Sequence, residues 1–205
     1  VAWRDLGDVP LLLEELVPFD REVSIIGVRG VDGTTARYPL VETQHEGGVL
    51  RAARAPAPTT AEQVDAEAAS IVERILAELD YVGVVAVELF ERDGRLLANE
   101  FAPRVHNSGH WTIEGAVVSQ FENHLRSILG WPLGSTAARG HSGLVNLLGV
   151  LPRRERVVGV DGAHLHEYGK APKPGRKLGH VTVTADTPEE RDRRLAAARA
   201  AVDAS

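Results

Sequence analysis

The sequence predicts an α+β protein, in which an antiparallel sheet packs against helices and precedes a small β-rich domain. Short apolar runs separated by glycine-containing turns indicate strands joined as hairpins. Two stretches with apolar residues at helical spacing indicate amphipathic helices. From about residue 135 the pattern changes to short strands, so we expect one domain over residues 1–135 and a second over residues 136–205.

Strands, an N-terminal connector and a final helix are predicted along the chain. An apolar run at 11–13 predicts a strand that leads into an extended connector ending at Pro18. A final helix is expected to open at Thr187 and Pro188, because proline is favoured at the first helical position. The other strands are predicted from turn-bounded apolar runs at residues 23–29, 35–41, 82–90, 96–101, 144–150, 164–168 and 180–184.

Two amphipathic helices are expected between these strands. The first begins at a capping box formed by Thr60 and Gln63 and runs to about Leu79. Its buried stripe is predicted to contain Val64, Ala68, Ile71, Val72, Ile75, Leu76 and Leu79. The second helix runs from about Gly115 to Leu129, and its predicted apolar side contains Val118, Phe121, Leu125 and Ile128 or Leu129.

Two acids interrupt the apolar runs of the predicted hairpin at 82–101. Glu88 and Glu100 each lie in an otherwise apolar strand, where an unpaired charge costs several kcal/mol or is forced to neutralise. A divalent cation held by both carboxylates would compensate this cost. An exposed hairpin face with both acids in water explains them equally well, because antiparallel sheets often have one solvated side.

The length of the hairpin loop distinguishes these two interpretations. A two-residue turn at Asp93 and Gly94 would separate the glutamates onto opposite faces. A three-residue loop over 92–94, with Gly94 in the left-handed conformation, puts both on one face. We expect the three-residue loop, which would leave two carboxylates and the nearby Asn99 in a position suited to Mg²⁺.

The composition limits the classes of function. The 205-residue chain has a formal charge of -6 and no long Lys/Arg tract, which argues against a nucleic acid or an anionic membrane as its partner. No apolar run approaches the roughly 20 residues that cross a bilayer, so we expect a cytoplasmic protein. Cysteine is absent, which excludes disulfides and thiolate metal sites. The chain has no methionine and opens on Val1-Ala2-Trp3, so we expect a piece of a longer protein.

Polar and charged residues are densely packed over residues 99–112, directly after a predicted strand. A solvated loop that caps neighbouring helices explains any one of these residues but not the whole set. Ser108 as a hydrolytic nucleophile is disfavoured, because Asn-Ser-Gly-His lacks the nucleophile-elbow pattern. His106 and His110 are four residues apart, as in helical zinc pairs, but the intervening Asn-Ser-Gly indicates a turn.

The segment Asn-Glu-Phe-Ala-Pro-Arg-Val-His-Asn-Ser-Gly-His-Trp-Thr at 99–112 resembles the signature of the 5-(carboxyamino)imidazole ribonucleotide synthetases, a family of the ATP-grasp superfamily. The similarity extends from Glu14 to Thr184. It implies that ATP, bicarbonate and aminoimidazole ribonucleotide react in de novo purine biosynthesis, through carboxyphosphate, to give the N-carboxylated ribonucleotide, ADP and phosphate. It also implies Mg²⁺ as cofactor and a homodimer.

The resemblance implies roles for individual residues in nucleotide binding. Glu14, Glu15, Leu16 and Val17 match the connector that bonds adenine through backbone groups, and Glu22 matches the acid that binds the ribose hydroxyls. The remaining matches are His45 beside the nucleotide, Asn99 and Glu100 as nucleotide contacts, and Glu88 with Glu100 as Mg²⁺ ligands. A strand-end cluster of acids and an exposed loop histidine would explain Glu14, Glu22 and His45 without a ligand.

The resemblance also implies a substrate site. Arg104 and His106 are the expected catalytic residues, with Arg104 stabilising the transferring phosphoryl group. Taken alone, the region around residue 176 is better explained as an ordinary basic turn, although an Arg-Lys pair flanked by glycine suits a phosphate. The expected contacts with the ribonucleotide are His106, Asn107, Ser108, Lys170, Arg176 and Lys177.

The activity of the isolated chain is one open question, and two other functions are alternatives to the one that the resemblance implies. Nothing before Val1 supplies the first ATP-grasp lobe or its glycine-rich phosphate loop, so we expect the isolated chain to be weakly active or inactive. Another ATP-grasp ligase, such as a formate-using transformylase or a biotin carboxylase, would share the same nucleotide residues. A non-catalytic binding or dimerisation module with this fold is a third interpretation.

Overall fold

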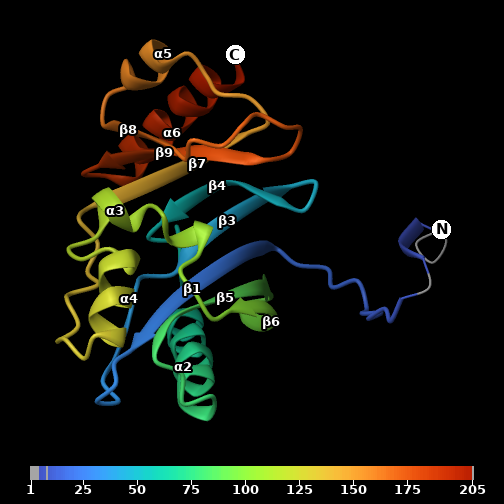
Figure 1. The fold of residues 1–205 in the computed structure, drawn as a ribbon, viewed down its shortest axis with the longest axis vertical. Helices are drawn as coiled ribbons and strands as arrows, with labels where there is room; N and C mark the ends of the chain where they lie inside the picture. The colour runs from blue at the N-terminus through green and yellow to red at the C-terminus, as the bar shows by residue number, and fades with distance from the viewer. Residues whose placement is uncertain (1–4, 8, 205) are drawn as a thin grey trace.

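The computed structural model describes residues 5–7 and 9–204, so the opening Val1-Ala2-Trp3 lies outside the described residues. A single nine-stranded sheet runs through the molecule in the order β6-β5-β1-β3-β4-β7-β9-β8, with β2 beside β1 (Figure 1). Every strand pair is antiparallel. The strands are β1 (Arg21–Arg29), β2 (Thr35–Arg37), β3 (Val41–Glu46), β4 (Val49–Ala55), β5 (Gly83–Arg92), β6 (Arg95–Ala102), β7 (His141–Leu148), β8 (Ala163–Glu167) and β9 (Lys177–Ala185).

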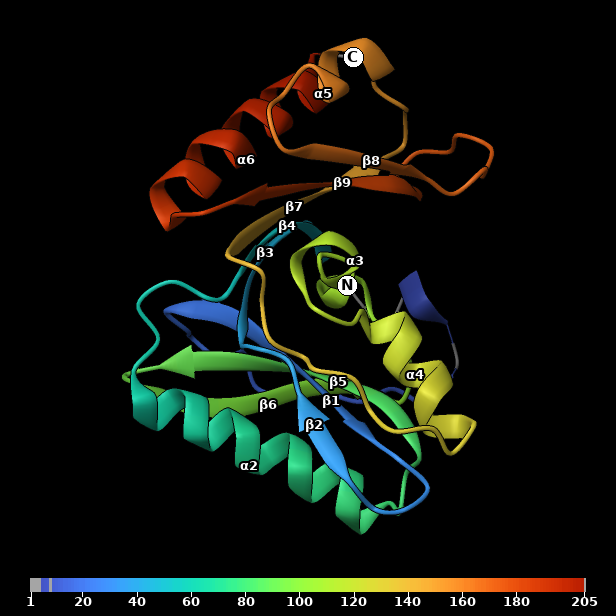
Figure 2. The same ribbon diagram turned by 90° about the vertical axis from the view of Figure 1, so that its left-hand side faces the viewer.

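Helices cover this sheet in three places, which confirms the predicted α+β class. Figure 2 shows α2 on one face of the β6-β5-β1 region and α4 on the other, while α5 and α6 lie beyond β7 and β9. Three apolar clusters form the core, and the one on the α4 side is made of sheet residues with Tyr38, Trp111 and Ala116, without residues of α4 itself. The helices are α2 (Glu62–Glu78), η1 (Asn107–Gly109), α3 (Thr112–Gly115), α4 (Gln120–Ile128), α5 (Arg154–Val158) and α6 (Pro188–Asp203). No helix in the described part of the chain has the length and apolar character needed to span a membrane.

The sheet continues across the position where the sequence predicts a domain boundary. Residue 135 lies between α4 and β7, and β7 pairs with β4 from Ala52 opposite Val145 to Ala55 opposite Ser142. The backbone ladder therefore joins the two regions. The division into 1–135 and 136–205 stays a prediction.

The first predicted helix forms, but its predicted capping box is wrong. The N-cap of α2 is Ala61, which makes no side-chain cap bond, and the hydroxyl of Thr60 instead donates to the carbonyl of Ala57. Most of the predicted stripe packs against the sheet, with Leu76 fully buried. Leu79 is 54% exposed because it follows the last helical turn.

The second predicted helix is wrong in its extent and in its buried side. The segment divides into α3 and α4, because Ser119 caps a new helix by accepting a hydrogen bond from the backbone of Glu122. The side of α4 that faces the protein is polar. Its Asn123 bonds to the hydroxyl of Tyr38 and to both backbone groups of Gly134. Satisfying these buried groups turns Leu125, Ile128 and Leu129 outward, each about half exposed.

The predicted strand at 11–13 is also wrong. Residues 10–19 are extended but have no strand assignment, and they lead away from the sheet at the start of β1 (Figure 1). Leu12 and Leu13 are 85% and 95% exposed, so no described element packs against them.

We predict that the buried stripe of α2 is a major source of stability. Replacing Leu76 with alanine removes a fully buried side chain and should lower the free energy of unfolding by about 2–5 kcal/mol. Leu79→Ala is the matched control on the same helix and should change it by less than about 0.5 kcal/mol. Urea denaturation of both variants measures the difference. Equal effects would contradict the assignment of the buried face.

Candidate functional site

The hairpin between β5 and β6 brings Glu88 and Glu100 together by a route that the sequence did not predict. Arg92 pairs with Arg95, so the turn contains only Asp93 and Gly94, both with positive φ, and the predicted three-residue loop is wrong. The ladder then shifts register beside Glu88.

The register shift is a β-bulge that contains one extra residue on β6. Leu89 pairs with Ala98, and Glu88 pairs with Glu100, which leaves Asn99 without a partner in the ladder. Two residues directly opposite in an antiparallel pair share a face. The two carboxylates therefore lie on one face, as the sequence analysis expected.

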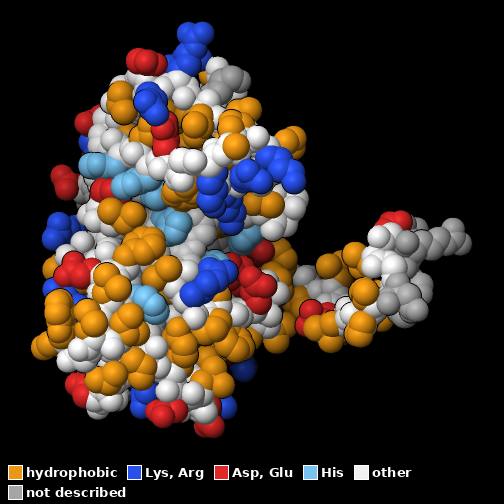
Figure 3. All heavy atoms as spheres, in the orientation of Figure 1, with side chains coloured by type: hydrophobic (Ala, Val, Ile, Leu, Met, Phe, Trp, Pro, Cys, Tyr) orange, Lys and Arg blue, Asp and Glu red, His pale blue; other side chains and the backbone are white. Residues whose placement is uncertain are grey.

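This face opens into a cavity of about 350 Å³, which we call the charged cavity. Figure 3 shows acidic, basic and histidine side chains gathered across the middle of this side of the molecule. Six strands and the segments that connect them supply the lining, so residues that are distant in sequence meet here. The lining residues are Glu22, His45, Gly48, Leu50, Glu88, Asn99, Glu100, Arg104, His106 and Lys177.

Glu88 lies at the centre of the interactions in the charged cavity. Its side chain is only 15% exposed. Burial raises the pKa of Glu88, and the nearby carboxylates of Glu100 and Glu22 raise it further, whereas His45 and Lys177 lower it. His45 donates from Nδ1 to Glu22 at 2.9 Å and places Nε2 3.8 Å from Glu88. The negative charge of the cavity is thus only partly compensated by its own bases.

His106 is neutral despite its contact with a carboxylate. Its Nε2 lies 3.3 Å from Oε1 of Glu88, a distance compatible with an ion pair. Burial nevertheless lowers the pKa of His106 to about 4, with further lowering by Arg104, Lys177 and His45. Nδ1 accepts a hydrogen bond from the backbone N–H of Ser108, so the ring proton is on Nε2 and faces Glu88.

A second cavity, of about 480 Å³, adjoins the first, and we call it the connector groove. Asn99 lines both cavities. The rings of Phe19 and Phe90 stack at its wall, 4.7 Å apart and inclined by 10°. All four connector residues predicted to bind adenine are in the lining, which consists of Glu14, Glu15, Leu16, Val17, Phe19, Phe90, Leu97, Ala98 and Asn99.

Several predicted substrate residues lie away from the charged cavity. Ser108 is fully buried, where its hydroxyl contacts Ser24 at 2.8 Å and His106 at 2.9 Å. The amide of Asn107 bonds to Asn146 and to His110. Lys170 and Arg176 lie on the exposed loop between β8 and β9, and only Lys177 of that basic motif lines the cavity.

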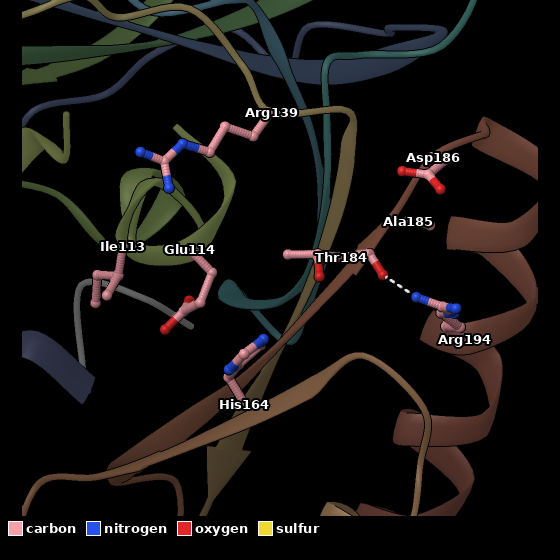
Figure 4. Close-up of a pocket in the computed structure, with 8 residues that line it drawn as sticks. All are labelled: Ile113, Glu114, Arg139, His164, Thr184, Ala185, Asp186 and Arg194. Atoms are coloured by element: carbon pink, nitrogen blue, oxygen red, sulfur yellow. Dashed lines mark hydrogen bonds between the residues drawn. The ribbon is translucent and has the colours of Figure 1, made fainter. Parts of the chain in front are cut away.

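A third cavity, of about 410 Å³, lies where α3 faces β8, β9 and α6 (Figure 4). Figure 4 shows Glu114, Arg139, His164 and Arg194 around it, with Arg194 bonded to the backbone oxygen of Thr184. None of the site residues predicted from the sequence is in its lining. The residues predicted to bind nucleotide and substrate therefore lie elsewhere in the molecule.

The donor set of the charged cavity fits a hard divalent cation that also has ligands from elsewhere. Among the described residues, no three His, Asp or Glu side chains form a group that could hold a metal ion alone. Glu88 and Glu100 face one another and supply carboxylate oxygens. Mg²⁺ is commonly held by one or two carboxylates together with phosphate oxygens and water. The raised pKa of the buried Glu88 is the feature that a bound cation would relieve.

The aromatic wall of the connector groove and the polar partners behind the site were not predicted from the sequence. Phe19 follows Pro18 and Phe90 ends an apolar run, so neither differs from an ordinary core residue in the sequence. Asn146 did carry a signal. It is a polar residue inside the apolar run of β7, and it is fully buried.

Comparisons with known proteins match most of the chain. The model of the ATP-grasp domain family matches residues 1–121, and the model of the phosphoribosylaminoimidazole carboxylase C-terminal domain matches residues 142–194. A Pseudomonas aeruginosa protein named N5-carboxyaminoimidazole ribonucleotide synthase is 51% identical over 203 residues, which are 99% of this chain and 56% of the relative. The chain spans about half the length of the curated relatives that it matches.

Solved structures give the same result. N5-carboxyaminoimidazole ribonucleotide synthetase from Thermus thermophilus is 56% identical with a TM-score of 0.89, over 91% of this chain and 52% of that one. The Aspergillus clavatus N5-carboxyaminoimidazole synthase, in complex with ADP and 5-aminoimidazole ribonucleotide, is 36% identical with a TM-score of 0.91. That match covers 98% of this chain and 56% of the other.

We predict that the neutral state of His106 makes the chain sensitive to acid. Below the ordinary histidine pKa of 6.5, the unfolded chain takes up a proton on His106 that the folded chain refuses until about pH 4. The free energy of unfolding should therefore decrease as the pH is lowered from 6.5 to about 4. The decrease for this residue is about 1.4 kcal/mol per pH unit. His106→Gln lacks this contribution, so the difference between wild type and variant should be constant above pH 6.5 and shift below it. Urea denaturation across the window measures it, and a pH-independent difference would contradict the assignment.

Proposed function

The chain belongs to the ATP-grasp family, and from this premise we propose that it forms part of the active site of an enzyme that carboxylates 5-aminoimidazole ribonucleotide. The proposed reaction uses ATP and bicarbonate and gives N5-carboxyaminoimidazole ribonucleotide, ADP and phosphate, through carboxyphosphate, in de novo purine biosynthesis. The names of the relatives and the bound molecules in the Aspergillus clavatus structure support this substrate.

The observation that best supports the proposal is the junction of two cavities at Asn99. The connector groove offers backbone groups of residues 14–17 and an aromatic wall, which suit a flat purine base. The charged cavity beside it offers acids and bases, which suit a ribose and a polyphosphate with its cation. In this proposal, one ATP molecule spans both, with Glu22 at the ribose and His45 beside the phosphates.

The side chains of the charged cavity have separate proposed roles. Glu88 and Glu100 would hold Mg²⁺, which offsets negative charge on the phosphate oxygens when it is bound. Arg104 and Lys177 bring positive charge to the same cavity, where an Arg can stabilise a transferring phosphoryl group. Neutral His106 keeps its Nε2 proton directed at Glu88, so it orients that carboxylate without adding a charge.

Other parts of the proposal concern the substrate and the assembly. Lys170, Arg176 and Lys177 would contact the ribonucleotide phosphate, together with His106 and the turn at 107–108. The exposed apolar side chains of Leu125, Leu129 and Trp131 support a homodimer, because contiguous apolar surface is typical of interfaces. A small-molecule enzyme in the cytoplasm, with neither a nucleic acid nor a membrane as partner, completes the proposal.

Two other functions compete with this one. Another ATP-grasp ligase would keep the nucleotide residues and accept a different amine or carboxylate, and competition between substrates separates the two. A non-catalytic module would bind no Mg²⁺-nucleotide even when joined to the rest of an ATP-grasp enzyme. Calorimetry with Mg·ADP detects this difference.

The main experiment measures ATP-dependent phosphate release with aminoimidazole ribonucleotide and bicarbonate. We expect little release from the chain alone and clear turnover once it is joined to the portion of the Pseudomonas aeruginosa relative that it does not cover. In that chimera, Glu88→Gln should lower kcat by about a hundredfold or more, because an electrostatic contribution of several kcal/mol is lost. Loss of a buried charge should not unfold the chain, and circular dichroism checks this.

Glu78→Gln is the control variant, since Glu78 lies at the exposed end of α2. It should leave turnover unchanged. Full turnover by Glu88→Gln would contradict the role of this carboxylate, and turnover with formate in place of bicarbonate would favour the transformylase.

A further inference from the structure

A chain of hydrogen-bonded side chains lies behind the charged cavity and outside its lining. It connects β4, β7, the turn at η1, the end of β8, and β9. Its side chains are amides, imidazoles and one phenol, and two of them are almost completely buried. We call this set the amide–imidazole chain, and its members are Asn146, Asn107, His110, Tyr168 and His180.

The direction of each bond follows from Asn146. Its Nδ2 donates to the backbone oxygen of Leu50 at 2.8 Å, and also to Oδ1 of Asn107 at 2.5 Å, so both of its N–H groups are used. Its Oδ1 then accepts from Nδ2 of Asn107 at 2.9 Å. The second N–H of Asn107 points to Nδ1 of His110 at 3.3 Å. The side-chain amide of Asn107 therefore has no free N–H to offer a substrate.

The same logic fixes the protons on the next three members. Nδ1 of His110 accepts from Asn107, so it carries no proton, and its single lone pair is shared between this N–H and the hydroxyl of Tyr168, 3.0 Å away. The oxygen of Tyr168 then accepts from Nδ1 of His180 at 2.8 Å. His110 is thus protonated on Nε2 and His180 on Nδ1. Burial lowers the pKa of His110 to about 4 and that of His180 to about 3, so both rings are neutral.

The imidazole rings around His180 are also in close contact with one another. His180 lies 4.9 Å from His110 and 4.5 Å from His166 between ring centroids, and the second pair is stacked with only 12° between the planes. Nε2 of His180 is buried and has no hydrogen-bond partner. That atom holds only a lone pair in the assigned tautomer, which makes its burial less costly than burial of an N–H group.

Tyr168 is the member of the amide–imidazole chain that reaches the exposed basic loop at 169–176. Its backbone N–H bonds to Leu178 across the base of this loop, and the Lys170 ammonium lies 5.4 Å from the centre of its ring. At the other end of the loop, Lys177 lines the charged cavity. A fixed Tyr168 therefore fixes the base of the loop relative to the turn that contains His106.

We propose that the amide–imidazole chain positions the basic loop for a phosphate monoester substrate, with the Tyr168 hydroxyl as the joint between the loop and the turn at 106–110. Asn107, His110, Tyr168 and His180 are positioning residues in this account. Their side chains act through the loop and do not touch the substrate, which the turn at 107–108 would meet only through its backbone. The identity of that substrate rests on the proposed function, whereas the hydrogen-bond chain and its effect on the loop do not.

The assigned protons can be tested in the 205-residue chain itself. Long-range ¹H–¹⁵N spectra of the imidazole rings should give the Nε2–H tautomer for His110 and the Nδ1–H tautomer for His180. In Tyr168→Phe, the Nδ1 resonance of His180 should move, because its acceptor is gone. The opposite tautomers, or an unchanged His180 resonance, would overturn the proposal.

Loop order is the second readout. Backbone ¹⁵N relaxation should give lower order parameters over residues 169–176 in Tyr168→Phe than in the wild type. Tyr38→Phe is the matched control, because its hydroxyl is also buried and bonded, but to Val118 and Asn123, which are outside the amide–imidazole chain. It should lower stability and leave the loop unchanged. A loop that responds equally to both variants, or to neither, would contradict a positioning role.

Kinetics in the chimera gives the third readout. Tyr168→Phe should raise KM for aminoimidazole ribonucleotide about three- to tenfold and leave KM for ATP and kcat near wild type. A general loss of kcat with both KM values altered would indicate structural damage and overturn the proposal. If the wild-type chimera uses a different phosphorylated substrate, the proposed function fails. A raised KM of Tyr168→Phe for that substrate, with KM for ATP and kcat near wild type, would still support the positioning role.

Discussion

Two carboxylates that face each other across a strand pair repel, and the structure holds Glu88 and Glu100 in this arrangement at the edge of the protein interior. Glu88 is half-buried and Glu100 is exposed, so the burial of Glu88 is the larger cause of its raised pKa and the charge of Glu100 adds to it. His45 and Lys177 relieve part of the repulsion, but the pKa of Glu88 is still raised. Such an arrangement lowers the stability of the ligand-free protein. It is expected where a bound ligand of opposite charge offsets this loss.

Two features of the surrounding fold bring the residues of this arrangement together. The bulge at Asn99 turns the β5–β6 ladder so that both acids share one face, and Asn99 itself joins the connector groove to the charged cavity. Continuity of the sheet from β4 to β7 and β9 brings Lys177 to the same cavity from a distant part of the sequence. The site thus depends on a ladder that crosses both matched family regions.

The sequence predicted the fold class and the pairing of the two acids, because a charge inside an apolar strand has a cost that is visible without a structure. It did not predict the bulge, since a two-residue turn with a bulge and a three-residue loop give the same face. The α4 prediction failed because periodicity counts apolar residues, whereas Asn123 is buried to satisfy the backbone of the distant Gly134. The amide–imidazole chain joins five segments, and only tertiary structure brings them together.

The central claim is that one nucleotide spans the two cavities, with its cation on Glu88 and Glu100. The most direct measurement is a crystal structure of the chimera grown with Mn·ADP, in which the anomalous signal locates the Mn²⁺ that replaces Mg²⁺. If one nucleotide spans both cavities, an anomalous peak is expected between the carboxylates of Glu88 and Glu100, with adenine in the connector groove beside Phe19 and Phe90. A peak coordinated by other residues, or adenine bound outside that groove, would contradict it.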